Sequence, residues 1–263
     1  MARDLKFFHF GYQCPNNAYL IALIKTIAWH ESVKLHLIDV TGDEETCRMY
    51  SIFSPTLVIV NDRHRWHGPF TKDKIIAMLE ADDDIEPEPR RVSQGRDIVR
   101  GDLIPITSKT VLDTCTTCTG TEDRKLCYGK GEWVGDMMRS TGLPHLGYLH
   151  LVDGGCVGGA EYLPSRSVPY PIPGKSNDAA FLTCSYVSHS EKDFKTHPLE
   201  RLVRDLADQG FKTLLVAASE EVVFPNGPAE WFEEKGFMDK GVLMREELHG
   251  AAVHLMSLDL DGR

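Results

Sequence analysis

The strongest constraint on the fold comes from the stretch 181–219, which reads FLTCSYVSHSEKDFKTHPLERLVRDLADQGFKTLLVAAS. FLTCSYVS is rich in β-branched and aromatic side chains and KTLLVAA is continuously apolar, so both predict buried strands. Between them we predict a helix that begins at Pro198 and ends at Gly210. Its apolar residues recur at i, i+3, i+4 and i+7 and form one stripe: Leu199, Leu202, Val203 and Leu206. A strand that leads into a helix N-terminus presents unpaired backbone N–H groups and the positive end of a dipole, which predicts a site for phosphate or another anion.

Length and composition set the broad class. With 263 residues, 42% of them hydrophobic, the chain is long enough for two domains with buried cores. A net charge of −10 argues against nucleic acid as a main partner and is compatible with a cationic or amine substrate. No apolar run approaches the length of a membrane span, and residues 1–6 lack the features of a signal peptide, so we predict a cytoplasmic protein with no membrane partner. Seven cysteines without a regular framework predict reduced thiols.

Residues 1–81 predict strands and helices in the order βαβαββα. The expected strands are 5–10, 34–40, 56–60 and a short one within 63–70, and the expected helices are 17–31, a short segment at 43–50 and 71–80. This order, with a Cys-Pro pair at Cys14 and Pro55 directly before the third strand, resembles the thioredoxin fold. The resemblance implies that the peptide bond before Pro55 is cis and that this proline lies beside Cys14.

One position departs from the thioredoxin pattern. Asn17 stands where the resolving cysteine is expected. A dithiol couple needs two sulfurs, so Cys14 alone is not expected to run disulfide exchange. Its place at a helix N-terminus nevertheless predicts a lowered thiol pKa and a reactive thiol. The alternative is that residues 1–81 form a structural or docking domain with an inherited cysteine.

Residues 82–97 are acidic and proline-rich, lack hydrophobic periodicity and predict a linker. Cysteines then concentrate at Cys115, Cys118 and Cys127. A spacing of two residues lets Cys115 and Cys118 bind one zinc ion or form a redox pair, and ordinary reduced thiols are the alternative. Further zinc ligands would have to come from a distance, for example from His145, His150 or Cys156. The presence of a metal therefore stays open.

The remaining predicted elements are a strand at 102–107, a helical start at 108–109, a hairpin of 147–153 and 156–164, a short helix within 228–237, and an antiparallel pair of 241–247 and 251–260. From about residue 98 onward this order resembles the GNAT acyltransferase fold. The stretch 181–219 corresponds to the acetyl-CoA motif of that family. PAEWFEEKGF matches its short helix that ends in a Gly-Phe pair, here Gly236 and Phe237.

We therefore predict an α/β protein with a thioredoxin-like domain over 1–81, a linker over 82–97 and a GNAT acyl-CoA N-acyltransferase fold over 98–263, whose sheet is mixed and mostly antiparallel. The fusion of these two domains is known within the GNAT superfamily. The resemblance implies transfer of an acetyl group from acetyl-CoA to an amine of a small molecule. It places the pantetheine arm along the first middle strand and the pyrophosphate at the helix N-terminus, with backbone N–H groups polarising the thioester carbonyl. The positions that it assigns to acetyl-CoA are Cys184, Ser185, Tyr186, Val187, Lys192, Lys195, Thr196 and His197.

Two departures from the GNAT pattern bear on activity. The loop HSEKDFKTHPLE contains no glycine, although glycine is what lets backbone approach a phosphate closely, and Pro198 removes one N–H donor. Counting back from Gly236 places Phe232 where the family has a tyrosine that protonates the departing thiolate. Loss of a general acid costs about 10²–10⁴-fold in rate.

Other residues are candidates for the missing chemistry. Tyr186 is a candidate acid, with a packed strand aromatic as the alternative. The candidate bases, each with a solvated surface residue as the alternative, are His189, Glu220, Glu221 and Glu161. Two other functions stay open. One is a catalytically impaired GNAT-like binding or sensor protein that uses its cysteines for a metal or thiol ligand. The other is a thiol-redox protein that works through Cys14 and the Cys115–Cys118 pair. The acceptor amine and the oligomeric state are not predicted.

Overall fold

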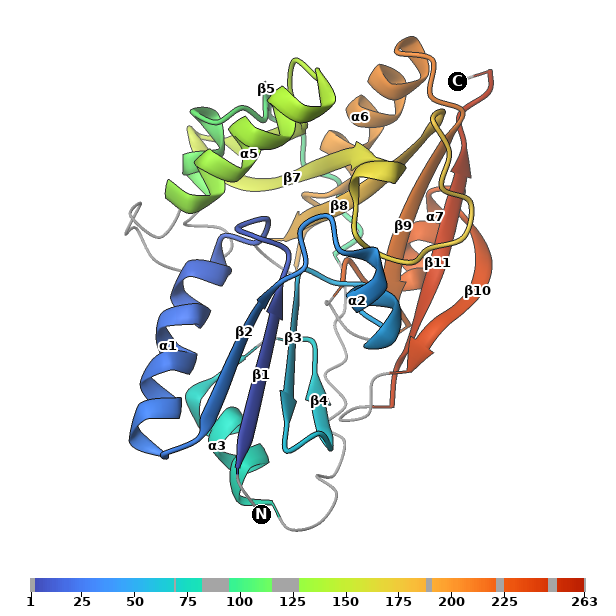
Figure 1. Ribbon diagram of the computed structural model, residues 1–263. Helices are drawn as coiled ribbons and strands as arrows, with labels where there is room; N and C mark the ends of the chain where they lie inside the picture. The colour runs from blue at the N-terminus through green and yellow to red at the C-terminus, as the bar shows by residue number, and fades with distance from the viewer. Residues whose placement is uncertain are drawn as a thin grey trace.

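The computed structural model of the protein describes residues 3–68, 70–81, 95–114, 128–187, 191–220, 225–245 and 250–262. Two mixed sheets organise this part of the chain (Figure 1). The smaller sheet has four strands in the order β2-β1-β3-β4, and the larger has seven in the order β10-β11-β9-β8-β7-β6-β5. The predicted α/β class with mixed sheets is confirmed.

The smaller sheet and its helices comprise β1 (Asp4–His9), α1 (Asn16–His30), β2 (Lys34–Asp39), α2 (Glu44–Met49), β3 (Thr56–Val60), β4 (His64–Trp66) and α3 (Lys72–Glu80). β1 is parallel to β2 and antiparallel to β3, and β3 is antiparallel to β4. The predicted order βαβαββα is confirmed, whereas the thioredoxin fold as such stays a prediction. The prediction of a cis peptide bond before Pro55 is wrong. Among the described residues, the cis peptide bond joins Gly227 to Pro228.

The larger sheet and its helices comprise β5 (Asp102–Pro105), η1 (Thr110–Thr114), α5 (Tyr128–Thr141), β6 (Gly147–Val152), β7 (Gly155–Pro164), η3 (Ser165–Ser167), β8 (Ala179–Val187), α6 (Thr196–Asp208), β9 (Thr213–Ser219), α7 (Ala229–Glu234), β10 (Met238–Arg245) and β11 (Ala252–Asp259). Its neighbouring strands are antiparallel except for β8 and β9, which are parallel. The predicted mostly antiparallel sheet is confirmed. Helix α6 begins two residues before the predicted Pro198, and Gly210 follows its end at φ +85°.

Helix α5 is an element that the sequence pattern does not predict. Its sequence YGKGEWVGDMMRST contains three glycines, which lower helix propensity and obscure the apolar periodicity. One of these glycines has a packing reason. A Cβ on Gly131 would lie 2.8 Å from the backbone oxygen of Ser108, so the helix passes this turn only because residue 131 has no side chain.

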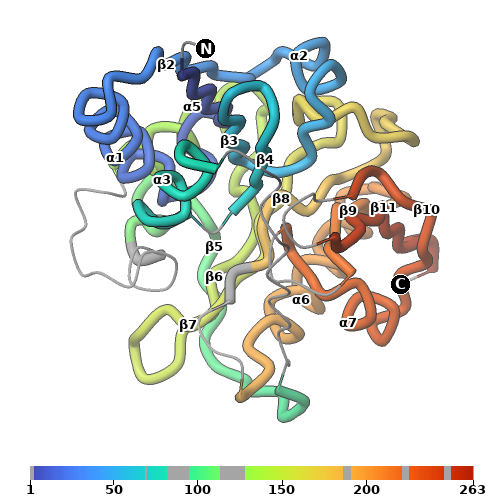
Figure 2. Tube along the Cα trace, turned by 90° about the horizontal axis from the view of Figure 1, so that it is seen from below, coloured from blue at the N-terminus to red at the C-terminus, as the bar shows by residue number. Residues whose placement is uncertain are grey.

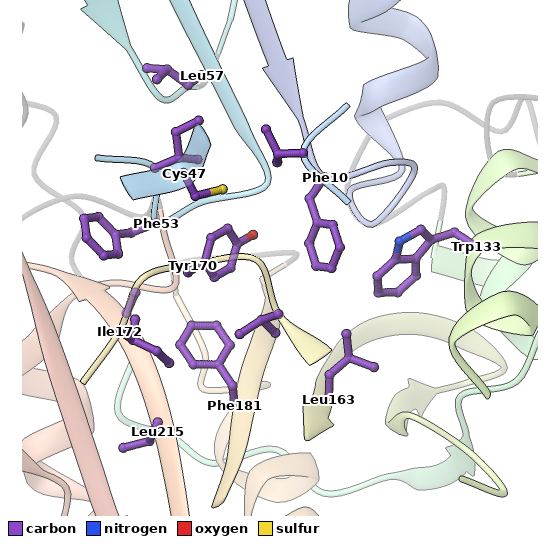
Figure 3. Packing of buried hydrophobic residues seen from close by; sticks show 14 of the residues in the cluster. Phe10, Cys47, Phe53, Leu57, Trp133, Leu163, Tyr170, Ile172, Phe181 and Leu215 are labelled. Carbon is purple, nitrogen blue, oxygen red and sulfur yellow. The ribbon is translucent and has the colours of Figure 1, made fainter. Parts of the chain in front are cut away.

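The two faces of the larger sheet carry separate buried clusters. Successive residues of β9 belong to different clusters, Leu215 to one and Leu214 to the other, because successive side chains of a strand point to opposite faces. Helices α6 and α7 cover one face, and the smaller sheet and α5 cover the other (Figure 2). On the second face, rings from both sheets interlock around Tyr170, whose centroid lies 5.9 Å from that of Phe10 and 5.6 Å from that of Phe181 (Figure 3). The contact between the two sheets is therefore a shared hydrophobic core.

None of the described helices is both long enough and apolar enough to cross a bilayer.

Candidate functional site

Strands β8 and β9 are paired over only part of their length. Their parallel register joins residues 179–181 to residues 213–215, although β8 continues to Val187 and β9 to Ser219. Beyond the register β8 follows β7 and β9 follows β11, so the two strands diverge. A register shift beside the divergence leaves Thr183 as an extra residue in β8, which is a β-bulge of the kind often found next to functional sites. We call the divergence between residues 184–187 and 216–219 the wedge.

The side chain of Asn226 bridges the wedge. Its Oδ1 accepts a hydrogen bond from the backbone N–H of Ser185 at 2.8 Å, and its Nδ2 donates to the backbone oxygen of Ala217 at 3.4 Å. The residue has φ +51°, a left-handed conformation that asparagine tolerates better than most residues. The wedge thus holds a neutral amide between one backbone donor of β8 and one backbone acceptor of β9.

The N-terminus of α6 is capped by a carboxylate of the chain itself. Asp193 Oδ1 accepts the N–H groups of Lys195 at 2.9 Å and Thr196 at 2.8 Å. Its Oδ2 accepts Trp231 Nε1 at 3.1 Å and the Thr196 hydroxyl, and the Lys235 ammonium lies 3.6 Å away. Burial favours a raised pKa for Asp193, but these hydrogen bonds outweigh it and hold the pKa below its ordinary value. A negative charge therefore already sits at the positive end of the helix.

Lys195 turns inward from the start of α6. The residue is 2% exposed, and its Nζ donates to the backbone oxygens of Asn226 at 3.3 Å and Gly227 at 3.2 Å. The ammonium also lies 4.1 Å from the centroid of the Trp231 ring, a cation–π distance. Burial lowers the pKa of Lys195 to about 7. Lys195 thus ties the start of α6 to the segment that crosses the wedge.

A surface pocket of about 620 Å³ lies beside the first turns of α6. It extends to the end of α7, and its lining combines apolar residues with three basic ones and one acid: Arg100, Thr196, Leu199, Glu200, Val203, Arg204, Lys235, Phe237 and Leu258. The volume is in the range of pockets that hold cofactors and small ligands. Because Thr196 lines it, the pocket opens at the α6 N-terminus.

A buried polar network joins the two sheets next to the bulge. Glu161 is 0% exposed, and its Oε1 accepts Gln13 Nε2 and the Thr183 hydroxyl, both at 2.8 Å. Its Oε2 forms an ion pair with Lys130, which is also 0% exposed and donates to the backbone oxygen of Gln13. The predicted base Glu161 is therefore one strand away from the wedge, with both oxygens engaged.

The predicted lowered pKa of Cys14 is wrong. Burial raises the pKa of this thiol and outweighs both the backbone N–H of Asn16 and the positive charge of Lys130. Burial also raises the pKa of Cys184 on β8, and the nearby negative charge of Glu161 acts in the same direction. Both thiols are free and only partly exposed. They are therefore neutral at physiological pH, and the helix terminus does not activate Cys14.

Several other predicted residues lie around the wedge. Ser185 provides the N–H that Asn226 engages, and the backbone positions of Tyr186 and Val187 continue β8 beyond the divergence. Glu220 follows β9 at the surface, where its Oε2 accepts the N–H of Ala252 at 3.3 Å. His197 lies in the first turn of α6, with ring nitrogens 3.0 Å from Arg100 Nη1 and 3.1 Å from the Gly101 oxygen, and Lys192 is exposed. The candidates His189, Glu221, Cys115, Cys118 and Cys127 lie outside the described residues.

Phe232, which the sequence count aligns with the general-acid tyrosine of GNAT enzymes, is part of the core. It is 0% exposed, and its ring packs edge-on against Trp231 and Phe237 at centroid distances of 4.9 and 5.1 Å. This residue fills the core between α7 and the sheet and supplies no proton. Within the described residues, no group of three or more His, Cys, Asp or Glu side chains is arranged to hold a metal ion.

The residues that shape the wedge were not among the sequence candidates. The sequence does indicate a capping role for Asp193, because an aspartate three residues before Thr196 fits a helix-capping pattern. Asn226 lies in a Pro-Asn-Gly-Pro turn whose sequence predicts only a loop. Lys130 and Gln13 come from segments far apart in the chain, and no local pattern pairs them.

No family model matches the sequence, and no curated protein matches it. Solved structures with a similar chain path are GNAT-type N-acetyltransferases. An N-acetyltransferase from Staphylococcus aureus Mu50 has 13% identity and a TM-score of 0.43, and the match covers 62% of this chain and 100% of that one. A ribosomal-protein-alanine N-acetyltransferase from Brucella melitensis has 15% identity and a TM-score of 0.42, with 60% and 99% covered. An aminoglycoside 6′-N-acetyltransferase complexed with coenzyme A has 14% identity and a TM-score of 0.42, with 62% and 98% covered. The function proposed below depends on the geometry of the wedge and not on these similarities.

Proposed function

We propose that the protein is an acyltransferase that moves an acetyl group from acetyl-CoA to the amine of a small molecule. The divergence of β8 from β9 carries this proposal. A pantetheine arm is an extended chain with two amide groups, and an extended chain pairs with the free edge of a strand. In the wedge such an amide would meet the Ser185 N–H and the Ala217 carbonyl, which now engage Asn226. The arm can therefore replace the Asn226 side chain without leaving a buried polar group unpaired.

The pocket beside α6 supports the same reading. It opens at Thr196, on the side of the larger sheet that α6 and α7 cover. A donor whose arm lies in the wedge would place its remaining part there. The acetyl carbonyl would lie near the β8 bulge, and a backbone N–H of that bulge would stabilise the developing oxyanion.

The transfer step needs a base for the amine and a proton for the thiolate. The amine nitrogen attacks the thioester carbon, the C–N bond forms, the C–S bond breaks, and the amine proton leaves. Phe232 cannot protonate the thiolate, so we propose that the thiolate departs without an acid at that position. Glu161, Tyr186, His189 and Glu220 remain proposed acid or base groups, and Glu161 would have to release one of the partners that engage both its oxygens before it could act.

A second candidate is a GNAT-like binding protein without catalysis. Two observations favour it, the carboxylate of Asp193 at the α6 terminus and the buried Phe232. The Asp193 carboxylate takes up N–H groups that would bind the donor's phosphates, and Phe232 cannot give the departing thiolate a proton.

Thermal unfolding with acetyl-CoA tests the proposal. A donor at 100 times its Kd adds about 2.7 kcal/mol of stability. The wild type should therefore melt at a higher temperature with acetyl-CoA and release free coenzyme A when a suitable small amine is added. Stabilisation without thiol release, across a panel of primary amines, would favour the second candidate. No stabilisation at millimolar acetyl-CoA would refute both.

An Asn226→Ala variant locates the site. It removes the group that occupies the wedge and leaves the Ser185 N–H unpaired, so acetyl-CoA should stabilise this variant more than the wild type. The matched control is Asn177→Ala, an exposed position just before the paired end of β8. Equal stabilisation of the two variants would show that the donor does not enter the wedge.

A further inference from the structure

Within the described residues, most of the groups at the α6 N-terminus that could bind an acyl donor's phosphates are already engaged. We infer, on the basis of the proposed acyltransferase function, that the protein recognises its donor through the neutral pantetheine arm and takes little affinity from the phosphates. The substrate class is then pantetheine thioesters in general, of which acetyl-CoA is one. Four sets of contacts support this inference.

The first turn of α6 has few free hydrogen-bond donors. The Thr196 N–H is taken by Asp193 at 2.8 Å, Pro198 has no N–H, and the Leu199 N–H bonds the Lys195 oxygen at 3.1 Å. Of the N–H groups that a helix terminus normally offers to an anion, only that of His197 lacks a partner within this turn. The charge at this terminus is also already compensated, because the Asp193 carboxylate occupies it.

The loop before α6 is covered in the same way. The Asp193 N–H donates to the Asp97 oxygen at 2.9 Å, and the Asp193 oxygen accepts the Val99 N–H at 3.0 Å. The Lys195 N–H is held by the Asp193 side chain at 2.9 Å. The segment 97–99, which leads into β5, thus lies against the loop and engages backbone groups that would otherwise be free to bind phosphate. Among residues 193–197, the N–H groups of Phe194 and His197 have no hydrogen-bond partner within the part of the chain that the structure describes.

Three basic side chains near the terminus have partners within the described residues. Arg100 lies 3.0 Å from a Glu200 oxygen, and the Lys235 ammonium lies 3.6 Å from Asp193. The Lys195 ammonium is buried against backbone oxygens and an aromatic ring. A phosphate would have to displace the buried partners of Lys195 and would compete with Asp193 for Lys235, so its net gain from these two side chains is small.

The backbone groups that Asn226 engages in the wedge are uncharged and suit an amide. Asn226 shows which chemistry fits, because its carboxamide uses one backbone donor on β8 and one backbone acceptor on β9. A pantetheine amide has the same donor and acceptor. The wedge therefore offers the arm the hydrogen bonds that α6 does not offer the phosphates.

Calorimetric titration of the full-length wild type tests the inference without any variant. The three probes are acetyl-CoA, S-acetyl-4′-phosphopantetheine and S-acetyl-pantetheine, which carries no phosphate. We expect the three Kd values to agree within about tenfold, since a single charge-assisted hydrogen bond to a phosphate would already exceed that ratio. Acetyl-CoA binding that is more than tenfold tighter than S-acetyl-pantetheine binding would overturn the inference and leave the acyltransferase proposal intact. Binding of none of the three would refute both.

An Asp193→Asn variant adds a second readout. It keeps a side-chain oxygen at the α6 terminus and removes the negative charge, so the preference for acetyl-CoA over S-acetyl-pantetheine should rise at least about tenfold. The control is Asp178→Asn, an exposed aspartate before β8, and circular dichroism confirms that each variant is folded. A merely structural role for Asp193 would change the two Kd values by the same factor, and this result would contradict the inference.

Discussion

Replacement of Lys130 by methionine tests how the two sheets are held together. Lys130 and Glu161 form an ion pair in which both residues are 0% exposed, and it joins α5 to β7 beside the smaller sheet's Gln13. Lys130→Met removes the ammonium that pairs with the buried Glu161 carboxylate and leaves the hydrogen bonds from Gln13 and Thr183 in place. Removing one partner of a buried pair costs about 3–5 kcal/mol, because the remaining charge is uncompensated.

Unfolding measurements give the loss of stability caused by Lys130→Met. For a chain of this size 1 kcal/mol corresponds to about 2–4 °C in Tm, so Lys130→Met should lower the Tm by roughly 6–20 °C. Urea unfolding, followed by tryptophan fluorescence, gives the free energy by linear extrapolation. Trp133 reports on the contact directly, because the Lys130 ammonium lies 4.5 Å from its ring centroid.

Two further variants separate the ion pair from general damage to α5. Lys130→Met combined with Glu161→Gln should recover at least about 1 kcal/mol relative to Lys130→Met alone, since no buried charge remains. Asp136→Asn breaks the exposed pair with Arg139 on the same helix and should cost less than about 1 kcal/mol. A loss below about 1 kcal/mol for Lys130→Met itself would refute the reasoning.

Three further predictions concern single positions. Gly131→Ala should destabilise the protein by about 1–3 kcal/mol because its Cβ would meet the Ser108 backbone, whereas Gly135→Ala, which meets the movable end of a side chain, should be neutral or stabilising in the same urea assay. The pKa of Lys195 is about 7 in the folded protein and 10.5 in its ordinary state. Between these two pH values the unfolded chain therefore carries a proton on Lys195 that the folded chain lacks, which favours unfolding more as the pH falls. The unfolding free energy of the wild type should therefore rise between pH 7 and pH 10 more than that of Lys195→Met, and parallel curves would contradict the assignment. The raised pKa of Cys14 predicts that iodoacetamide modifies it at pH 7 more slowly than it modifies an unstructured cysteine, as mass spectrometry of the native and urea-unfolded chains will show; equal rates would disprove it.

Local patterns were sufficient to predict most elements of both sheets. Strand β3 coincides with the predicted 56–60, and Gly210 ends α6 as expected. These successes share a cause, because alternation, apolar stripes and glycine stops act over a few residues. Helix α5 was missed for a related reason. Its glycines serve contacts with other parts of the chain, such as that of Gly131 with Ser108, and these contacts leave no local periodicity.

The candidate site was less predictable than the fold. The strand–loop–helix outline indicated where an acyl donor would lie, and the glycine-free loop indicated an unusual helix terminus. Neither pattern predicted that Asp193 and Asn226 fill the two places that a donor would use, since this depends on where the 225–228 turn and the 97–99 segment lie in space. The direction of the Cys14 pKa shift was missed because burial of the thiol outweighs the effect of the helix terminus, and burial is not visible in the local sequence.

Amide hydrogen exchange with and without acetyl-CoA tests the central claim most directly, namely that an acyl donor binds between β8 and β9. The account predicts slower exchange in peptides that cover residues 183–187 and 216–219, and unchanged exchange in strands β1–β4 of the smaller sheet. Protection confined to the smaller sheet, or binding of acetyl-CoA with no protection at the wedge, would contradict it.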